Sequence, residues 1–270
     1  MTIAGSDSGG GAGIQADLKA FSRFNTHGTS VITALTAQNP HLVAAIYPIP
    51  VAHVVEQFRT VMAAIKVNAI KSGMLFSAEI IAAIAAELAA ASDPVPLVVD
   101  PVMVASSGAV LLQEDAIDAL VEKLIPLATV ITPNLPEAEI LAGVMLEQHD
   151  EAGALRLAVQ LATDFGTAVL VKGGHCDAGK SSDILATGEA VFRITTPEVA
   201  AATTHGTGCM LSAAICANLA LGREPHDAIV AAKAYVYHNL ADCRRIGPKT
   251  YAMCPPRSND QTVVGVVRLK

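Results

Sequence analysis

The chain has 270 residues, of which 52% are hydrophobic and 16% are charged, and its net charge is −7. This length and apolar content favour one large α/β domain whose core needs no disulfides. The acidic balance excludes the basic surface of a nucleic-acid-binding protein, and no apolar run is long enough to span a membrane. The five cysteines include no Cys-x-x-Cys pair, and Met1 leads into a glycine cluster without a basic secretion signal. We therefore expect a cytoplasmic protein.

Apolar runs and amphipathic segments alternate along the chain. The first half predicts, in chain order, Met1–Ala4 (strand), Ala12–Phe24 (helix), Thr29–Leu35 (strand), Val51–Ile65 (helix), Ala69–Ser72 (strand), Ala78–Ala91 (helix), Leu97–Val99 (strand) and Glu114–Leu124 (helix). The second half predicts Thr129–Thr132 (strand), Pro136–Leu141 and Glu151–Phe165 (helices), Ala168–Val171 (strand), a hairpin of Asp183–Ala186 and Ala190–Thr195, and the helices Gly208–Leu221 and Pro225–Ala241. This alternation is typical of an α/β protein with helices on both faces of a mostly parallel sheet.

No internal repeat or linker divides the chain. We expect one domain over residues 1–243 and an atypical tail over residues 244–270 that packs on the same domain. The apolar run Val263–Val267 in this tail is either an added strand or part of a poorly ordered end.

Polar residues follow several predicted strands where the chain leaves the sheet. They are Gly5-Ser6-Asp7, Asp100, Asn134 with Glu137, and Lys172-Gly173-Gly174-His175. In an open parallel sheet, ligands bind at the carboxyl ends of the strands. The recurrence therefore predicts one binding site at this edge of the sheet.

The first glycine cluster, Gly5 to Gly13, joins a strand to a helix. Glycines let backbone amides approach a ligand, and a helix start favours anions. The cluster lacks the Gly-Lys-Ser/Thr ending of a P-loop, and a flexible turn is the alternative interpretation. Asp17 follows one helical turn later and is either part of the site or a solvated helix residue.

A second glycine segment, Thr204 to Cys209, precedes an apolar helix. Its Gly-Thr-Gly sequence at a helix start predicts an anion hole suited to the charge of a transferring phosphoryl group. Cys209 lies at this helix start, where the helix dipole lowers the pKa of a thiol below its usual value of about 8.5. The alternative is a small buried cysteine without a chemical role.

The loop from Thr132 to Glu137 contains two prolines and two polar side chains one helical turn apart. Oxygens of Asn134 and Glu137, together with Asp100 from a neighbouring strand end, can hold Mg²⁺ and its waters. The alternative is a helix cap, with Asn134 as N-cap and Glu137 completing a capping box. Lys172 can bind phosphate as a point charge, or it is a surface lysine.

Together these segments resemble the ribokinase-like superfamily and, within it, the hydroxymethylpyrimidine/phosphomethylpyrimidine kinases of thiamine biosynthesis. The resemblance covers Thr2 to about Ala241 and rests on the order and spacing of Ile3–Asp17, Ser30–Asn39, Lys71–Leu75, Val99–Met103, Thr132–Ala138, Lys172–His175 and His205–Cys209. It implies a three-layer α/β/α ribokinase-like fold. It also implies two successive transfers of the γ-phosphate of ATP to a small pyrimidine, with Mg²⁺, by a homodimer.

The resemblance also implies roles for individual residues. Gln38 would hydrogen-bond the pyrimidine, and the residues shaping its pocket would be Gly5, Asp17, Met74 and Val102. Asp100 and Glu137 would organise Mg²⁺, and the residues beside the nucleotide would be Thr132, Asn134, Lys172 and His205. The catalytic anion hole would consist of Gly206, Thr207, Gly208 and Cys209, with the Cys209 thiolate accepting the alcohol proton.

Two other functions compete with this interpretation. A pyridoxal kinase of the same branch also carries the Gly-Thr-Gly-Cys arrangement. A non-catalytic protein that keeps the fold and binds pyrimidine is the second alternative. The tail from Lys249 to Lys270 departs from the family pattern, which puts the contacts to adenine in doubt.

Overall fold

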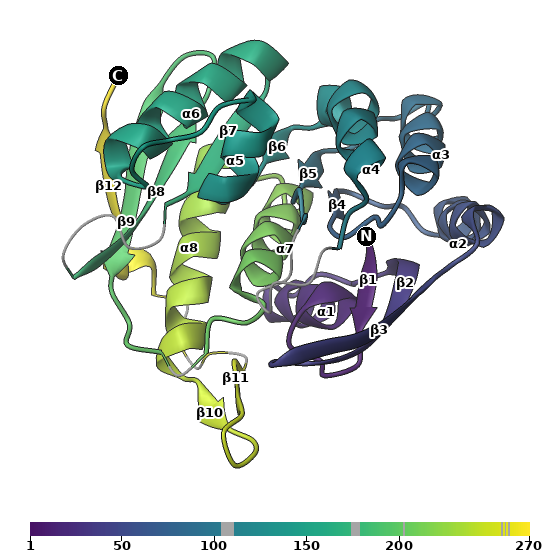
Figure 1. Ribbon diagram of the computed structural model, residues 1–270, viewed down its shortest axis with the longest axis horizontal. Helices are drawn as coiled ribbons and strands as arrows, with labels where there is room; N and C mark the ends of the chain where they lie inside the picture. Colours follow the sequence, from purple (N-terminus) through teal and green to yellow (C-terminus); the bar gives the residue numbers. More distant parts are fainter. Residues whose placement is uncertain (104–110, 174–178, 202, 255, 257, 259) are drawn as a thin grey trace.

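The structure is a computed structural model that describes residues 1–103, 111–173, 179–201, 203–254, 256, 258 and 260–270 (Figure 1). Two residues of a segment singled out above, Gly174 and His175, lie outside the described residues. Among the described helices, none combines the length and apolar character that crossing a membrane requires.

Within the described residues, one ten-stranded sheet runs through the molecule in the order β12-β9-β8-β7-β6-β5-β4-β1-β2-β3. Its strands are β1 (Thr2–Asp7), β2 (Ser30–Asn39), β3 (Leu42–Pro48), β4 (Ile70–Ser72), β5 (Leu97–Val99), β6 (Val130–Ile131), β7 (Ala168–Lys172), β8 (Lys180–Ala186), β9 (Val191–Pro197) and β12 (Gly265–Arg268). The strands from β7 to β2 pair in parallel, whereas β3 at one end and β8, β9 and β12 at the other pair antiparallel. The expected, mostly parallel sheet is confirmed.

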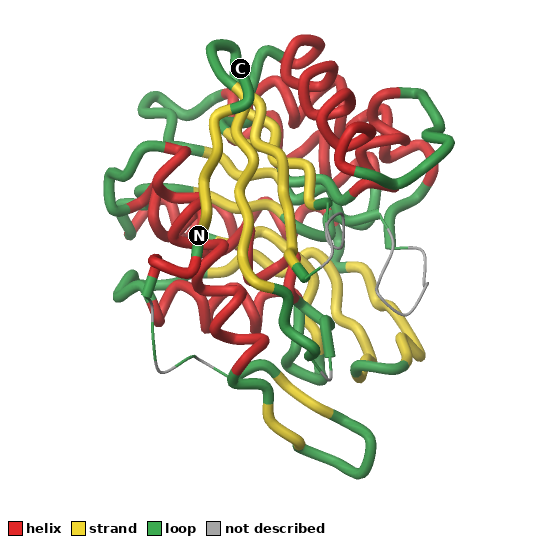
Figure 2. Tube along the Cα trace, turned by 90° about the vertical axis from the view of Figure 1, so that its left-hand side faces the viewer, coloured by secondary structure: helices red, strands yellow, loops and turns green. Residues whose placement is uncertain are grey.

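Helices cover both faces of this sheet and produce three layers (Figure 2). One face carries α1 (Gly13–Arg23), α7 (Thr207–Ala220) and α8 (Pro225–Ala241). The other carries α2 (Val51–Ala64), α3 (Ala78–Ala89), α4 (Glu114–Ala119), α5 (Leu135–Ala142) and α6 (Glu151–Phe165). Each group packs on its own apolar core, so the α/β/α fold class predicted from the sequence is correct.

Helix α7 is buried on all sides because it lies between the sheet and its neighbours α1 and α8. Ten consecutive residues from Met210 to Leu219 are buried, and most are alanine or other small residues. Small side chains let three helices and a sheet approach one another closely. The start of α7 is therefore held firmly at the edge of the sheet where the site was predicted.

Helix boundaries follow capping chemistry that is readable in the sequence. Asn134 and Glu137 form a complete capping box at the start of α5, and the Asp150 side chain accepts the Gly153 N–H at the start of α6. Both helices end at a glycine in the left-handed region, Gly143 with φ 64° and Gly166 with φ 63°.

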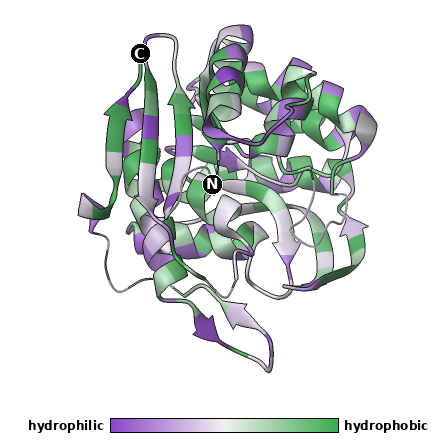
Figure 3. Ribbon diagram, turned by 60° about the vertical axis from the view of Figure 1, so that its left-hand side comes forward, coloured by the Kyte–Doolittle hydropathy of each residue, from purple (hydrophilic) through white to green (hydrophobic). Residues whose placement is uncertain are grey.

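The sequence did not predict two features. Strand β2 continues to Asn39 and pairs with β3. Most side chains of β3 are exposed, so its sequence lacks the apolar alternation that marks a half-buried strand. The hairpin of β10 (Arg244–Arg245) and β11 (Tyr251–Ala252) extends from the body of the molecule and is largely polar at β10 (Figure 3). Of the two alternatives for the tail, the structure has the added strand, since β12 pairs with β9.

Candidate active site

A cavity of about 520 Å³ lies at the carboxyl ends of the parallel strands. It brings together most of the site residues predicted from the sequence, namely Gly5, Gln38, Met74, Asp100, Val102, Asn134, Glu137, Lys172, His205, Gly206, Thr207, Gly208 and Cys209. Asp17 and Thr132 do not line it. The glycine turn before α7 thus shares one cavity with both Gln38 and Asn134, as a single site requires.

At one end of the cavity, Gln38 lies where the pairing of β2 with β3 is irregular. The register shifts between Ala37 and Gln38, and such a bulge re-aims a side chain at the end of a strand. The Thr36 hydroxyl, which donates to the Ser6 carbonyl at 2.9 Å, also lies 3.1 Å from the Gln38 Oε1 and helps to orient the amide group. Nearby, the Met74 sulfur is 3.1 Å from the place that a Cβ on Gly5 would occupy. This end therefore presents an oriented amide beside an apolar wall.

The glycine turn before α7 lies against the first glycine cluster. Gly206 has φ 85°, and a Cβ there would overlap the carbonyl of Gly11, so only glycine fits. The Thr207 N–H donates to the Thr204 carbonyl at 3.2 Å. In the described structure, no protein acceptor takes the N–H groups of Gly208 and Cys209. These two amides at the helix start can therefore face an anion.

Cys209 is partly exposed to the cavity, and its sulfur accepts the Gly13 N–H. Burial raises the pKa of the Cys209 thiol to about 11, and the opposing charge of Lys71 does not cancel this effect. The expectation of a lowered thiol pKa at the helix start is therefore wrong. Desolvation of the thiolate outweighs the helix dipole, which acts only through partial charges.

Near the middle of the cavity, Asp100 is the centre of a charged cluster. Lys172 Nζ lies 3.0 Å from Asp100 Oδ1 and 3.9 Å from Glu137 Oε2. The Ser212 hydroxyl donates to Asp100 Oδ2 at 3.0 Å, and the Thr132 hydroxyl donates to Asp100 Oδ1 at 3.3 Å. Thr132 thus contacts the cavity only through Asp100. Lys172 is 18% exposed and paired, so the interpretation as a surface lysine is wrong.

The pKa values of the two carboxyl groups in this cluster are shifted in opposite directions. Burial alone would raise the pKa of Asp100, but the charges of Lys172 and Lys71 and the hydrogen bonds hold it below its usual value. Burial and the charge of Asp100 raise the pKa of Glu137 despite Lys172. Two close carboxylates beside a cation are a donor set that suits Mg²⁺, which takes one or two carboxylates together with water and phosphate oxygens.

Across the described residues, no three His, Cys, Asp or Glu side chains gather closely enough to hold a metal ion by themselves. Asn134 and Glu137 form the capping box that was the alternative interpretation, and Glu137 also approaches Lys172. Glu137 therefore belongs to the cap and to the charged cluster at the same time.

Asp17 lies behind the cavity wall instead of in it. Its carboxylate is buried, accepts the Thr2 hydroxyl at 2.6 Å and binds Lys71 Nζ at 3.0 and 2.9 Å. Lys71, which the sequence analysis did not single out, lines the cavity. Burial would lower the pKa of Lys71, but the charge of Asp17 raises it, so Lys71 stays protonated. Asp17 is thus connected to the cavity through Lys71 and does not line it directly.

We expect Lys71→Met to lower the free energy of unfolding by about 3–5 kcal/mol, because the buried carboxylate of Asp17 loses its counter-charge. Urea denaturation monitored by circular dichroism measures this. The double variant Asp17→Leu/Lys71→Met, which removes both charges, should recover most of the loss. A single variant as stable as the parent protein would show that the pair is dispensable for folding.

Two further groups lie in the cavity wall: Asp7, which the sequence analysis placed at a strand end without giving it a role, and Lys233, which it missed. Asp7 ends β1 and binds His205, which joins the two glycine segments. Lys233 from α8 binds Asp183 Oδ2 at 2.6 Å and Ser181 Oγ at 3.0 Å, toward the end of the cavity that Val199 and Tyr237 line. A lysine within an apolar helix, as Lys233 is, was the available sequence signal for the second group.

Known proteins are similar to this chain over most of its length. Residues 7–253 match the sequence profile of the phosphomethylpyrimidine kinase family. The chain is 46% identical over 246 residues to the hydroxymethylpyrimidine/phosphomethylpyrimidine kinase of Rhizobium meliloti, covering 91% of each chain. It is 48% identical over 236 residues, or 87% of its length, to the thiamine biosynthesis bifunctional protein ThiED of Geobacter sulfurreducens, of which it spans about half (48%).

Among solved structures, the pyridoxal kinase from Staphylococcus aureus in complex with AMP-PCP and pyridoxal is similar over 99% of this chain and 97% of its own. The TM-score is 0.85 and the sequence identity 32%. Fold, profile match and identity over most of the length of the Rhizobium protein point to one conclusion. The chain belongs to the phosphomethylpyrimidine kinase family.

Proposed function

We propose that this chain is an ATP-dependent kinase of thiamine biosynthesis. It phosphorylates 4-amino-5-hydroxymethyl-2-methylpyrimidine and then converts the monophosphate to the diphosphate. One observation carries the proposal: a single cavity joins an oriented amide, Gln38, to two free backbone amides at the start of α7 and to the charged cluster of Lys172 and Asp100.

Different residues along the cavity contact the pyrimidine and the phosphoryl group. The Gln38 amide can donate to or accept from an aminopyrimidine edge, and Met74 packs against the ring. The amides of Gly208 and Cys209 and the ammonium of Lys172 stabilise negative charge on the phosphoryl group in transit. Phosphoryl transfer depends on this positioning and charge neutralisation more than on covalent chemistry.

Mg²⁺ fits the carboxylates of Asp100 and Glu137, with the Asn134 side chain beside them. When bound, it would neutralise charge on the phosphate oxygens of ATP. The Lys172 ammonium then lies between these carboxylates and the phosphates. Its role is to hold the phosphate chain at the start of α7.

Cys209 is the acceptor of the alcohol proton in this proposal. With a pKa of about 11 the thiol is protonated at neutral pH in the empty cavity, so only the small fraction that has lost its proton to solvent can accept the alcohol proton. In a loose transition state the alcohol loses its proton late, and a strong base is not needed. The charge of Lys71 favours this thiolate, which takes the alcohol proton and becomes a neutral thiol as the new P–O bond forms.

A pyridoxal kinase is the second candidate, because the Staphylococcus aureus enzyme that was solved with pyridoxal shares the fold. The higher identity to the Rhizobium pyrimidine kinase, 46% against 32%, favours the pyrimidine. We further propose a homodimer, which the family resemblance implies, located in the cytoplasm, with the tail packed on the kinase domain.

The decisive assay offers MgATP with hydroxymethylpyrimidine or with pyridoxal and follows the products by mass spectrometry. We expect one and then two added phosphates on the pyrimidine. Phosphorylation of pyridoxal alone would replace the proposal by the second candidate. Pyrimidine binding without ATP turnover would identify a non-catalytic binding protein.

A further inference from the structure

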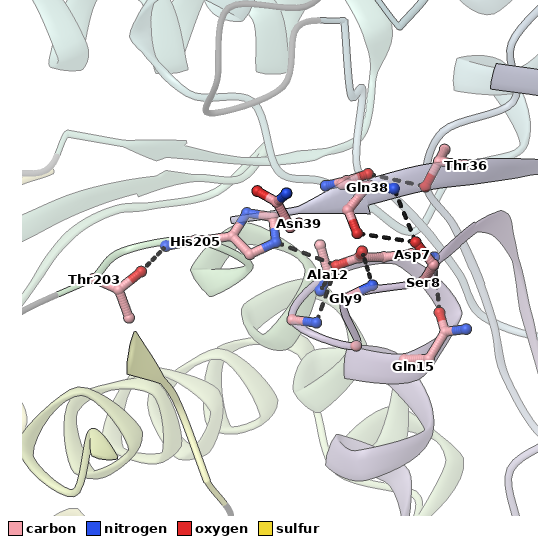
Figure 4. Close-up of polar contacts among 12 residues, drawn as sticks. Asp7, Ser8, Gly9, Ala12, Gln15, Thr36, Gln38, Asn39, Thr203 and His205 are labelled. Atoms are coloured by element: carbon pink, nitrogen blue, oxygen red, sulfur yellow. Dashed lines mark hydrogen bonds and ion pairs between the residues drawn. The ribbon is translucent and has the colours of Figure 1, made fainter. Parts of the chain in front are cut away.

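A chain of contacts connects the strand that carries Gln38 to the turn before α7 (Figure 4). The Ser8 hydroxyl accepts the Gln38 N–H at 2.8 Å and donates to the Gln38 carbonyl at 2.9 Å. The preceding residue, Asp7, contacts His205 Nε2 through Oδ2 at 3.2 Å. The loop after β1 thus touches the expected pyrimidine-binding residue on one side and the phosphate-binding turn on the other.

The Asp7 carboxylate is 2% exposed and saturated with donors. Oδ1 accepts the Gly9 N–H at 2.8 Å, and Oδ2 accepts the N–H groups of Gly11 at 3.0 Å and Ala12 at 2.8 Å. Burial alone would raise the pKa of Asp7, but the bonds from His205 and the three amides lower it below its usual value. An ionised carboxylate accepts hydrogen bonds only. The proton of a neutral His205 ring must therefore be on Nε2.

His205 also packs directly on the loop that Asp7 organises. A Cβ on Gly11 would lie 2.6 Å from His205 Cδ2, and the next residue after the histidine, Gly206, touches the Gly11 carbonyl. The His205 backbone N–H is fixed by the Thr203 hydroxyl at 3.2 Å. A shift of the Asp7 carboxylate would therefore move the ring and the first residues of α7 together.

We propose that Asp7 is a positioning residue, whose carboxylate holds His205, and through it the turn from Gly206 to Cys209, in register with the strand that carries Gln38. The proposal rests on the proposed function, since it assumes that the alcohol and the phosphoryl group meet between these two elements. A misplacement of reacting groups by about 1 Å can cost about 100-fold in rate. The rate gained by fixing the two elements relative to each other therefore offsets the cost of burying the Asp7 carboxylate.

The first test is a cycle of Asp7→Asn, His205→Asn and the double variant, with kcat and KM measured for pyrimidine and for MgATP. Asn keeps one acceptor oxygen but removes the charge. We expect each single variant to lower kcat about tenfold or more, with KM for the pyrimidine within about twofold, because Ser8 still holds Gln38. The double variant should be no slower than the slower single variant. Losses that multiply would show that Asp7 does not act through His205.

Asp150→Asn is the matched control. Asp150 also accepts a backbone N–H, that of Gly153 at 2.7 Å, but it caps α6 away from the cavity and has no histidine partner. Its kcat should equal that of the parent protein. If the melting temperature of Asp7→Asn is well below that of this control, the proposal is tested with His205→Asn alone. A kcat unchanged by the loss of the ring would then overturn the proposal.

A second measurement does not depend on activity. Two-bond ¹H–¹⁵N correlation spectra of the histidine rings report which nitrogen carries the proton, and His205→Asn assigns the signal among the eight histidines. We expect the Nε2-protonated form for His205. A ring protonated on Nδ1 would refute the arrangement even in an active enzyme. The expected tautomer in a protein that fails to phosphorylate pyrimidine would refute only the proposed function.

Discussion

Replacement of Cys209 by alanine is expected to lower kcat by about 10²–10⁴-fold while the fold survives, which is the range for loss of a proton-transferring side chain. The sulfur lies at the start of α7, accepts the Gly13 N–H and faces the cavity. Without it, no side chain at this helix start can receive the alcohol proton. Steady-state kinetics at saturating MgATP and pyrimidine, with a thermal melt of each variant, measure the effect.

Cys216→Ala provides the matched control for this experiment. Cys216 lies on the same helix, and burial raises the pKa of its thiol to about 11 as well, but it does not line the cavity. We expect this variant to lose some stability through the smaller side chain and to retain kcat. Near-normal turnover in Cys209→Ala would remove the thiol from the mechanism and leave the alcohol proton to the phosphate oxygens.

The residues whose position in the cavity local patterns predicted are those that follow strands. Asp100, Asn134 and Lys172 come directly after apolar runs, and a parallel sheet brings the ends of such runs to one edge. Their meeting in one cavity needed only the alternation of strands and helices. Glu137 was found for the same reason, although its capping role and its place near Lys172 had been treated as alternatives.

The features that the sequence analysis did not predict depend on contacts between distant segments. Asp17 and Lys71 are 54 positions apart, and nothing near either residue shows that each neutralises the other in the core. Cys209 is a similar case. The sequence shows the helix start, but it does not show the burial that raises the pKa of the Cys209 thiol. Asp7 and His205 are 198 positions apart and meet only when two glycine segments pack together.

Strand β3 was not predicted for a different reason. Hydrophobic alternation marks strands with one face on a core, but β3 is at the edge of the sheet and most of its residues are exposed. Its role is to pair with the end of β2, where the bulge beside Ala37 orients Gln38. Backbone pairing of this kind leaves little trace in residue type, so the sequence predicted Gln38 but not the strand that supports it.

Asp100→Asn is expected to lower kcat by about 10²–10³-fold, the range for loss of one preorganised electrostatic group, and to raise the Mg²⁺ concentration needed for half-maximal rate. Asn keeps the shape and can still contact Ser212 and Thr132. It removes the charge that pairs with Lys172 at 3.0 Å and the carboxylate proposed for the metal. Kinetics at fixed ATP with varied Mg²⁺ separate a metal effect from a loss of phosphate positioning.

Ser212→Ala is the control, since it removes one hydrogen bond of 3.0 Å to Asp100 and leaves the charge in place. It should reduce kcat by much less than Asp100→Asn and leave the Mg²⁺ requirement almost unchanged. If the two variants were equally slow and neither needed more Mg²⁺, the orientation of Asp100 rather than its charge would govern the rate. The assignment of Asp100 to the metal would then fail, while Lys172 and the amides of α7 would still account for phosphate binding.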